Sequence, residues 1–186
     1  LSSDPRFDKK RMVLWGHSRN GKSALVAAAF DPRVSGVIAH QSGRGGAALT
    51  RSTLGETVAE ITEKYPYWFA PDFKNYAGME QSLPIDQHQL IALIAPRPVL
   101  FTGGRSDGWA DPEGAFRAIQ GAQPAYQLMG SDGLKQPDMK HPDLTGDLSF
   151  YIRGGNHGST TYDWNMFLDW MDAHFTNASA AGISAQ

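Results

Sequence analysis

The stretch that most constrains the fold runs from Met12 to Lys22 and reads Met-Val-Leu-Trp-Gly-His-Ser-Arg-Asn-Gly-Lys. A short apolar run ends at a Gly-His-Ser tripeptide, and a segment of small, mostly apolar residues follows at once. This order is typical of a strand, a tight turn and a helix that expose a serine hydroxyl for nucleophilic attack. The pattern predicts that Ser18 is a nucleophile.

The same turn leaves a second interpretation open. Gly16 precedes Ser18 by two positions, as in the common G-x-S-x-G pattern, but the second glycine falls one position late, at Gly21, with Asn20 in its place. Serine is also favoured at the start of a helix, where its hydroxyl caps a free N–H. From local sequence alone, Ser18 is either a nucleophile or a helix cap.

Strand-like and helix-like segments alternate along the rest of the chain. We expect strands at 11–15, 34–40, 97–104, 125–129 and 150–153, and helices after Ser18 and at 52–64, 86–94, 113–120 and 162–175. Such alternation predicts a mostly parallel sheet with helices on both faces, a three-layer α/β fold. We expect a single domain over 1–186, with a frayed tail at 176–186.

Composition narrows the classes of function. The 186 residues carry 17 basic and 19 acidic side chains without long runs of one sign, so nothing predicts a nucleic-acid surface. The chain has no cysteine and no H-E-x-x-H motif, and no apolar stretch approaches the roughly 18 residues of a membrane span. We expect no metal, no cofactor and no membrane or nucleic-acid partner. Because the chain begins with leucine, and no signal peptide precedes it, we expect a fragment or processed form.

The order of reactive residues along the chain predicts a catalytic triad. A serine hydroxyl needs a neighbouring base, and a carboxylate holds that base in its useful tautomer. In α/β-hydrolases these groups follow in the order Ser, Asp or Glu, His. Ser18, Asp107 and His157 occur in that order, and His157 alone among six histidines lies between close glycines just before the last helix.

Several motifs then carry a family resemblance: Gly16–Lys22, Ser42–Ala48, Gly55–Thr57, Tyr65–Phe69, Asp107–Pro112 and Gly154–His157. The first resembles the G-[CH]-S-R-x-G-K signature of glucuronoyl esterases, carbohydrate esterase family fifteen. The others look like that family in order and spacing, most closely its bacterial branch. The resemblance covers nearly the whole chain, and it implies an α/β-hydrolase fold of which the chain holds a C-terminal portion without the N-terminal strands.

The resemblance also implies an activity and roles for individual residues. Enzymes of this family hydrolyse esters between 4-O-methyl-glucuronate on glucuronoxylan and lignin alcohols, through an acyl-enzyme. By this resemblance Ser18 is the nucleophile and His157 the general base. Arg19 would stabilise the oxyanion with its backbone N–H and its cationic side chain.

Three further side chains match family positions that contact the sugar. Lys22 and Glu56 would hydrogen-bond its hydroxyls, and Trp109 would form an amphipathic wall with an N–H donor. Each also has a plainer explanation: a solvated helix lysine, a carboxylate favoured by a helix dipole, and a packing tryptophan. Together they suit a polar, acidic sugar, whereas a simple acetyl ester needs no cation there.

Gln41 departs from part of the family. In some members, notably the fungal ones, the triad acid is a glutamate just before the Ser-Gly-x-Gly-Gly turn, where this chain has Gln41. A neutral amide cannot stabilise an imidazolium as a carboxylate does. We therefore expect Asp107 to be the acid, as in the bacterial members that the chain resembles.

Two other functions stay open. One is an acetylxylan-type or general carboxylesterase of the same fold, and the other is a non-catalytic carbohydrate-binding homologue, which aromatic residues at Tyr65–Phe73 and Trp109 would also serve. The substrate class implied by the resemblance predicts glucuronoxylan or a lignin-carbohydrate ester as the partner. It also predicts a secreted or periplasmic protein that acts in plant biomass degradation, and we expect a monomer.

Overall fold

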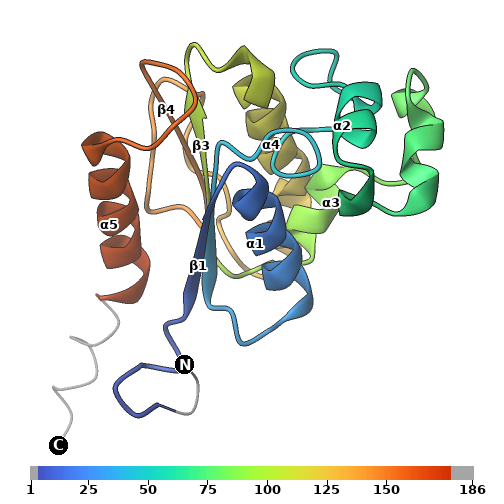
Figure 1. The fold of residues 1–186 in the computed structure, drawn as a ribbon. Helices are drawn as coiled ribbons and strands as arrows, with labels where there is room; N and C mark the ends of the chain where they lie inside the picture. The colour runs from blue at the N-terminus through green and yellow to red at the C-terminus, as the bar shows by residue number, and fades with distance from the viewer. Residues whose placement is uncertain (1–3, 177–186) are drawn as a thin grey trace, which may run out of the picture.

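The computed structural model describes residues 4–176, and a parallel sheet in the order β1-β2-β3-β4 lies at its centre. The strands are Val13–His17, Gly36–His40, Val99–Gly104 and Leu148–Arg153. Helix α5 (Thr161–Phe175) covers one face, and α1 (Arg19–Phe30), α3 (Gln87–Ala92) and α4 (Pro112–Leu128) cover the other (Figure 1). The α/β fold with a parallel sheet, predicted from the alternation of segments, is confirmed.

The two central strands explain why their sequences are almost continuously apolar. Every residue of β2 and β3 is buried, and successive side chains of a strand point to opposite faces of the sheet. In β2, Val37 and Ala39 enter the larger core beneath α1, α3 and α4, while Ile38 joins Phe167 and Trp170 of α5 in the smaller core. Each fully buried large side chain contributes about 1.5–3 kcal/mol, so both faces hold the sheet in place.

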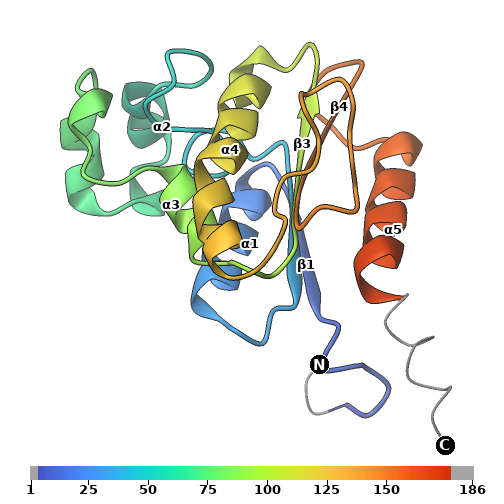
Figure 2. The ribbon, with the colours of Figure 1, turned by 180° about the vertical axis from the view of Figure 1, so that it is seen from behind.

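The carboxyl ends of the four parallel strands lie at the same edge of the sheet. The chain leaves β1 at Ser18, β2 at Gln41, β3 at Arg105 and β4 at Gly154, so four loops begin side by side there. Helix α2 (Val58–Lys64) and the short 3₁₀ turns between 66 and 82 project to one side of the helical face (Figure 2). In open α/β sheets this edge is where ligands bind.

Two expectations about secondary structure are wrong. Residues 125–129 do not form a strand, because α4 continues through Pro124 to Leu128. Proline normally ends a helix, but here burial of Tyr126 and its hydrogen bond to the Arg97 carbonyl at 2.8 Å stabilise the helix beyond it. The helix expected at 52–64 starts only at Val58, because Thr57 caps it in a capping box with Glu60.

The other expected elements differ from the observed ones at their ends. The strand expected at 11–15 is shifted to Val13–His17, and the helix expected at 162–175 gains one residue. The tail expected to fray at 176–186 lies outside the described residues beyond Thr176, the C-cap of α5.

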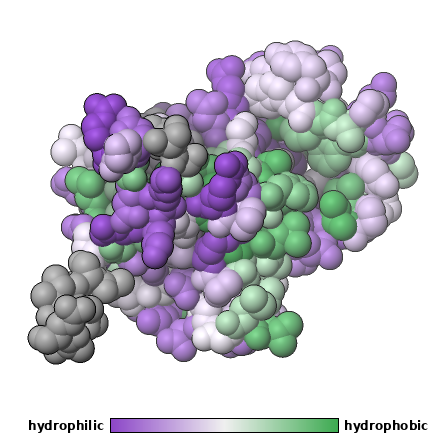
Figure 3. Space-filling view, turned by 90° about the horizontal axis from the view of Figure 1, so that it is seen from below, coloured by the Kyte–Doolittle hydropathy of each residue, from purple (hydrophilic) through white to green (hydrophobic). Residues whose placement is uncertain are grey.

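Apolar side chains also reach the surface. Strand β1 is at one edge of the described sheet, and its Trp15 side chain is 41% exposed. Seen from below, hydrophobic residues appear in the middle and right of the view (Figure 3), and α1 exposes Val26 and Phe30. Within residues 4–176, no helix combines the length and apolarity needed to cross a bilayer.

Candidate active site

Ser18 lies in a strained turn between β1 and α1. Its backbone has φ 56° and ψ −123°, a conformation that non-glycine residues rarely adopt and that is typical of an exposed nucleophile. Its N–H donates to the carbonyl of His40 at 2.9 Å, which fixes the turn to β2. In the described structure the Ser18 side chain makes no capping hydrogen bond. The helix-cap interpretation is therefore wrong, and the hydroxyl is free for another role.

The two glycines of the turn allow close packing at that point. A Cβ on Gly16 would lie 2.2 Å from the carbonyl oxygen of Asn20, and one on Gly21 would lie 2.8 Å from Cβ of Ser42. Atoms this close cannot coexist, so both positions require glycine. The glycine displaced to position 21 thus serves the contact between α1 and the loop after β2.

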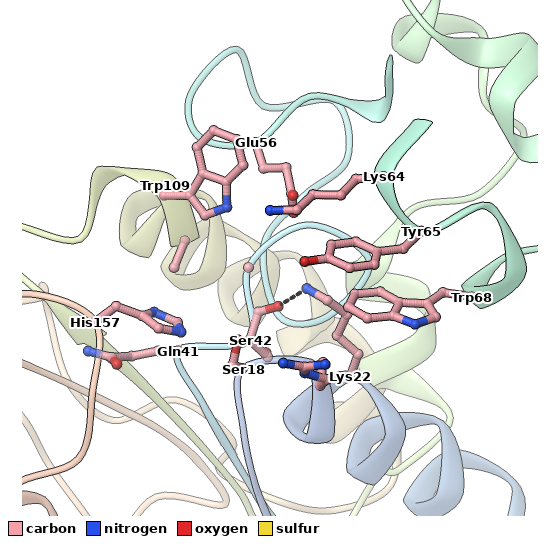
Figure 4. A pocket seen from close by; sticks show the side chains of 13 residues that line it. Ser18, Lys22, Gln41, Ser42, Glu56, Lys64, Tyr65, Trp68, Trp109 and His157 are labelled. Carbon is pink, nitrogen blue, oxygen red and sulfur yellow. Dashed lines mark hydrogen bonds between the residues drawn. The ribbon is translucent and has the colours of Figure 1, made fainter. Parts of the chain in front are cut away.

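His157 and Asp107 form a hydrogen-bonded pair beside Ser18. Asp107, 5% exposed in the loop after β3, accepts from Nδ1 of His157 at 2.7 Å through Oδ2. This contact holds the proton on Nδ1 and leaves Nε2 as the basic nitrogen. His157 and Ser18 line the same pocket (Figure 4). Among the described residues no hydrogen bond joins them, a contact that often tightens only when substrate binds.

Two further histidines pack behind the pair. The ring of His17 lies 4.5 Å from that of His157 and 4.9 Å from that of His40, centre to centre. Burial lowers the pKa of His17, and it lowers the pKa of His40 to about 4. Both rings are therefore neutral at pH 7. They add no positive charge that would oppose formation of an imidazolium at His157.

Lys22 joins α1 to the loop after β2. Its Nζ donates to the carbonyl of Ser42 at 2.5 Å, drawn in Figure 4, and to that of Arg44 at 2.7 Å. Burial lowers the pKa of Lys22 to about 8, against the opposing charge of Glu56. An ammonium has three N–H groups, so one remains for a ligand in the pocket that Lys22 lines. This residue is not a solvated helix lysine.

Arg44 holds the segment that carries Glu56. The guanidinium is buried and donates to the carbonyls of Leu49, Thr50, Ser52, Leu54 and Glu56. Glu56 is itself buried at the pocket wall, and its desolvation raises its pKa. Sequence analysis missed Arg44, because an arginine between glycines does not reveal that later carbonyls close around it.

Aromatic side chains form the outer wall of the pocket. The rings of Tyr65 and Trp68 stack at 3.9 Å with 2° between their planes, and the Arg19 guanidinium lies 5.9 Å from the centre of the Trp68 ring. Trp109 is 53% exposed and also lines the pocket, so it is not a packing residue. Lys64 at the end of α2 also lines the pocket and was not anticipated.

The structure brings together every side chain singled out in the sequence. Six of them line one pocket: Ser18, Arg19, Lys22, Glu56, Trp109 and His157. The seventh, Asp107, lies behind His157 as its hydrogen-bond partner. Over residues 4–176 no cluster of three or more His, Cys, Asp or Glu could hold a metal ion. The arrangement supplies a hydroxyl, a base, a carboxylate and a wall of polar and aromatic groups.

Comparisons with known proteins place the chain in a family. The family model "Glucuronyl esterase, fungi" matches residues 1–130. A carbohydrate esterase from an unknown prokaryotic organism is 42% identical over 181 residues, covering 96% of this chain and 42% of that protein. The 4-O-methyl-glucuronoyl methylesterase 1 of Wolfiporia cocos is 33% identical over 154 residues, covering 79% of this chain and 34% of its own length.

Solved structures match as well. A promiscuous CE15 esterase from the marine bacterial metagenome superposes with a TM-score of 0.89 and 42% identity, over 94% of this chain and 44% of that one. The glucuronoyl esterase from Solibacter usitatus superposes with a TM-score of 0.85 and 36% identity, over 94% and 45%. The chain thus spans less than half the length of these relatives. By the family model and these relatives, the chain belongs to the CE15 family of glucuronoyl esterases.

Proposed function

We propose that this chain carries the catalytic residues of a serine esterase that cleaves 4-O-methyl-glucuronoyl esters in glucuronoxylan, including esters to lignin alcohols. The observation that carries the proposal is the pocket in which Ser18 and the His157–Asp107 pair meet Lys22 and Glu56. Relatives named 4-O-methyl-glucuronoyl methylesterases support the substrate class.

The first half of the reaction forms an acyl-enzyme. Oγ of Ser18 attacks the ester carbonyl carbon while Nε2 of His157 takes the hydroxyl proton, and the Asp107 carboxylate stabilises the imidazolium that results. The carbonyl oxygen becomes an oxyanion next to Arg19, whose N–H is one of the first of α1 and has no acceptor within the helix. The imidazolium then protonates the alcohol oxygen as the ester C–O bond breaks, and the alcohol leaves.

Water completes the cycle. His157 removes a proton from a water molecule, which attacks the carbonyl carbon of the acyl-enzyme. A second oxyanion forms in the same position and collapses as the bond to Oγ of Ser18 breaks. His157 returns its proton to the serine, and the free uronate is released.

The opposite wall of the pocket selects the sugar. The remaining N–H of Lys22 and the carboxyl of Glu56 provide a donor and an acceptor for neighbouring hydroxyls. Trp109 provides an apolar face with an N–H at its edge. Because this substrate is a polymer of the plant cell wall, we also propose that the protein acts outside the cytoplasm. We propose that it acts as a monomer.

The test compares the hydrolysis of two esters by the natural polypeptide that carries these residues, with Ser18→Ala as the control. Benzyl glucuronate and 4-nitrophenyl acetate are hydrolysed side by side, and kcat/KM is measured for each. We expect turnover that favours the uronate and that is lost in Ser18→Ala by a factor of about 10⁴ or more.

A broader carboxylesterase is the second candidate, because one relative at 42% identity is named a promiscuous CE15 esterase. Turnover that favours the acetate and still depends on Ser18 would support it and would contradict the uronate specificity. Absence of turnover with both esters, together with measurable binding of methyl glucuronate, would instead support a carbohydrate-binding role.

A further inference from the structure

Gln41 bridges the two residues on either side of His157. The Gly158 N–H donates to its Oε1 at 2.8 Å, and its Nε2 donates to the Asn156 carbonyl in a longer contact of 3.4 Å. The side chain is only 2% exposed and lines the pocket beside His157 (Figure 4). One amide group therefore holds the main chain immediately before and immediately after the proposed base.

We propose that Gln41 is a positioning residue, whose amide holds the His157 loop from both sides and keeps the imidazole aligned between Asp107 and Ser18. The inference rests on the proposed serine-esterase chemistry. Gln41 touches no reacting atom in this scheme and acts only through His157.

The backbone of Gln41 and the space around its side chain both fit an amide. The Gln41 backbone has a positive φ of 47°, a conformation that non-glycine residues rarely adopt. A Cβ on Gly104 would lie 2.8 Å from its Nε2, so the end of β3 is shaped to leave room for it. A strained backbone and a fitted neighbour both fix where the amide points.

Other contacts support this loop but do not replace Gln41. Arg153 donates to the carbonyls of Gly154, Asn156 and Gly158, and Nε2 of His40 also contacts the Gly158 carbonyl. These side chains hold carbonyl groups. The Gly158 N–H has the Gln41 oxygen as its acceptor, and this is the group directly after His157.

An amide suits both partners because it donates and accepts at once. An ionised carboxylate of the same length only accepts, so it would satisfy the Gly158 N–H but turn a negative oxygen toward the Asn156 carbonyl. A protonated carboxyl can again do both. Gln41→Glu therefore tests the proposal in a way that depends on pH.

The matched control is Gln136→Glu. Gln136 is also buried, accepts from the Phe150 N–H at 2.8 Å and donates to the Asp138 carbonyl at 2.8 Å. Gln136 thus makes the same pair of hydrogen bonds beside β4, and it does not line the pocket. If loss of such a bridge acts only on folding, both variants will change the melting temperature and neither will change kcat.

In the natural polypeptide that carries these residues, we expect Gln41→Glu to lower kcat at pH 7.5 about ten- to a hundred-fold with KM unchanged, because displacement of a catalytic group lowers the rate steeply. The ratio of variant to wild-type kcat should rise as the pH falls, since burial raises the pKa of a glutamate and its protonated form restores the donor. The groups that share this region are Asp107 and His157, His17 and His40, and Arg153. They are present in both proteins, and the pH profile of Gln41→Met, which adds no titrating group, separates their titration from that of the new carboxyl.

A second variant and a second readout keep the outcome clear. Gln41→Met preserves length without either hydrogen bond, and we expect the same loss of kcat without recovery at low pH. The rate at which a fluorophosphonate labels Ser18 needs the triad but not the sugar pocket. If the uronate proves not to be a substrate while labelling still slows only in the Gln41 variants, the proposed function fails and the positioning role stands.

Three results would overturn the proposal. One is wild-type kcat and labelling in both Gln41 variants. Another is an increase in kcat in Gln41→Glu, which would show that a carboxylate there assists the base. The last is an equal loss of kcat in Gln136→Glu, which would reduce the effect to folding.

Discussion

The two walls of the pocket are built differently. On the catalytic wall, Ser18 and Asp107 follow the ends of β1 and β3, and Asp107 is almost wholly buried. On the opposite wall, Tyr65 and Trp68 lie in or beside a short 3₁₀ turn, and Trp109 is more than half exposed. Ser18, Asp107 and His157 thus lie within four residues of the ends of β1, β3 and β4. Glu56, Tyr65 and Trp68 instead lie on the long segment between β2 and β3.

We therefore expect substitutions in the two walls to change different kinetic parameters. Groups that act only on the transition state change kcat, and groups that bind substrate and transition state alike change KM. A substitution on the catalytic wall that changed KM alone, or one on the outer wall that changed kcat alone, would contradict this difference.

Asp107→Asn should have the largest effect. The amide keeps the shape of the side chain but allows the wrong tautomer of His157, so kcat should fall about 10⁴-fold with KM nearly unchanged. Asp169→Asn makes the same change at an exposed position of α5 and serves as control. Steady-state kinetics on benzyl glucuronate measure both. A loss of less than ten-fold would show that the carboxylate is not the partner on which His157 depends.

Arg44→Lys should weaken substrate binding through the segment that carries Glu56. A lysine has three donors in place of the guanidinium's contacts to five carbonyls, so the segment with Glu56 loosens. We expect KM to rise about ten-fold and the free energy of unfolding to fall by about 3 kcal/mol. Denaturant unfolding and kinetics check this, with the exposed Arg117→Lys of α4 as control. A fall in kcat with constant KM would contradict it.

The pH dependence of KM should report on Lys22. Below its pKa of about 8 the ammonium has three N–H groups, of which two bind the Ser42 and Arg44 carbonyls. As the pH rises through 8 the amine keeps only two, so the donor for the substrate is lost. The KM for the uronate should rise about five-fold between pH 7 and 9.5, the equivalent of one hydrogen bond. With 4-nitrophenyl acetate, which has no hydroxyl to bind, KM should stay flat, and a flat profile for the uronate would exclude this role.

Trp109→Ala should have the smallest effect. Its side chain is 53% exposed, so its removal leaves little cavity and should shift the melting temperature by less than about 2 °C. The uronate KM should rise about three-fold, because only one partly exposed contact disappears. Trp164→Ala, at a tryptophan of α5 that is 47% exposed, is the matched control. Equal KM values for the two variants would show that Trp109 does not contact the substrate.

The sequence predicts best where the signal is local. Continuous apolar runs indicated β2 and β3, because strands buried on both faces need apolar residues at every position. The order Ser18, Asp107, His157 identified the residues that the structure brings together, because all three follow strands whose carboxyl ends share one edge. The strand expected at 125–129 is wrong because α4 continues through Pro124, where tertiary packing of Tyr126 outweighs a local helix breaker.

Contacts between distant residues were beyond prediction from one sequence. The absence of an acid at Gln41 was visible, but its partners lie 115 and 117 positions further along the chain. Likewise, the helical spacing around Lys22 does not indicate that its Nζ turns toward two carbonyls of another loop. Such contacts depend on how the helices, strands and loops pack, and no local sequence pattern predicts them.

The way in which Arg44 holds its segment has a consequence for evolution. Its bonds end on main-chain oxygens, and every amino acid provides such an oxygen. The exposed side chains of Thr53 and Leu54 are therefore free to diverge among descendants while the path of the loop persists. One arginine at this position would then keep Glu56 at the pocket wall while these neighbouring surface residues change.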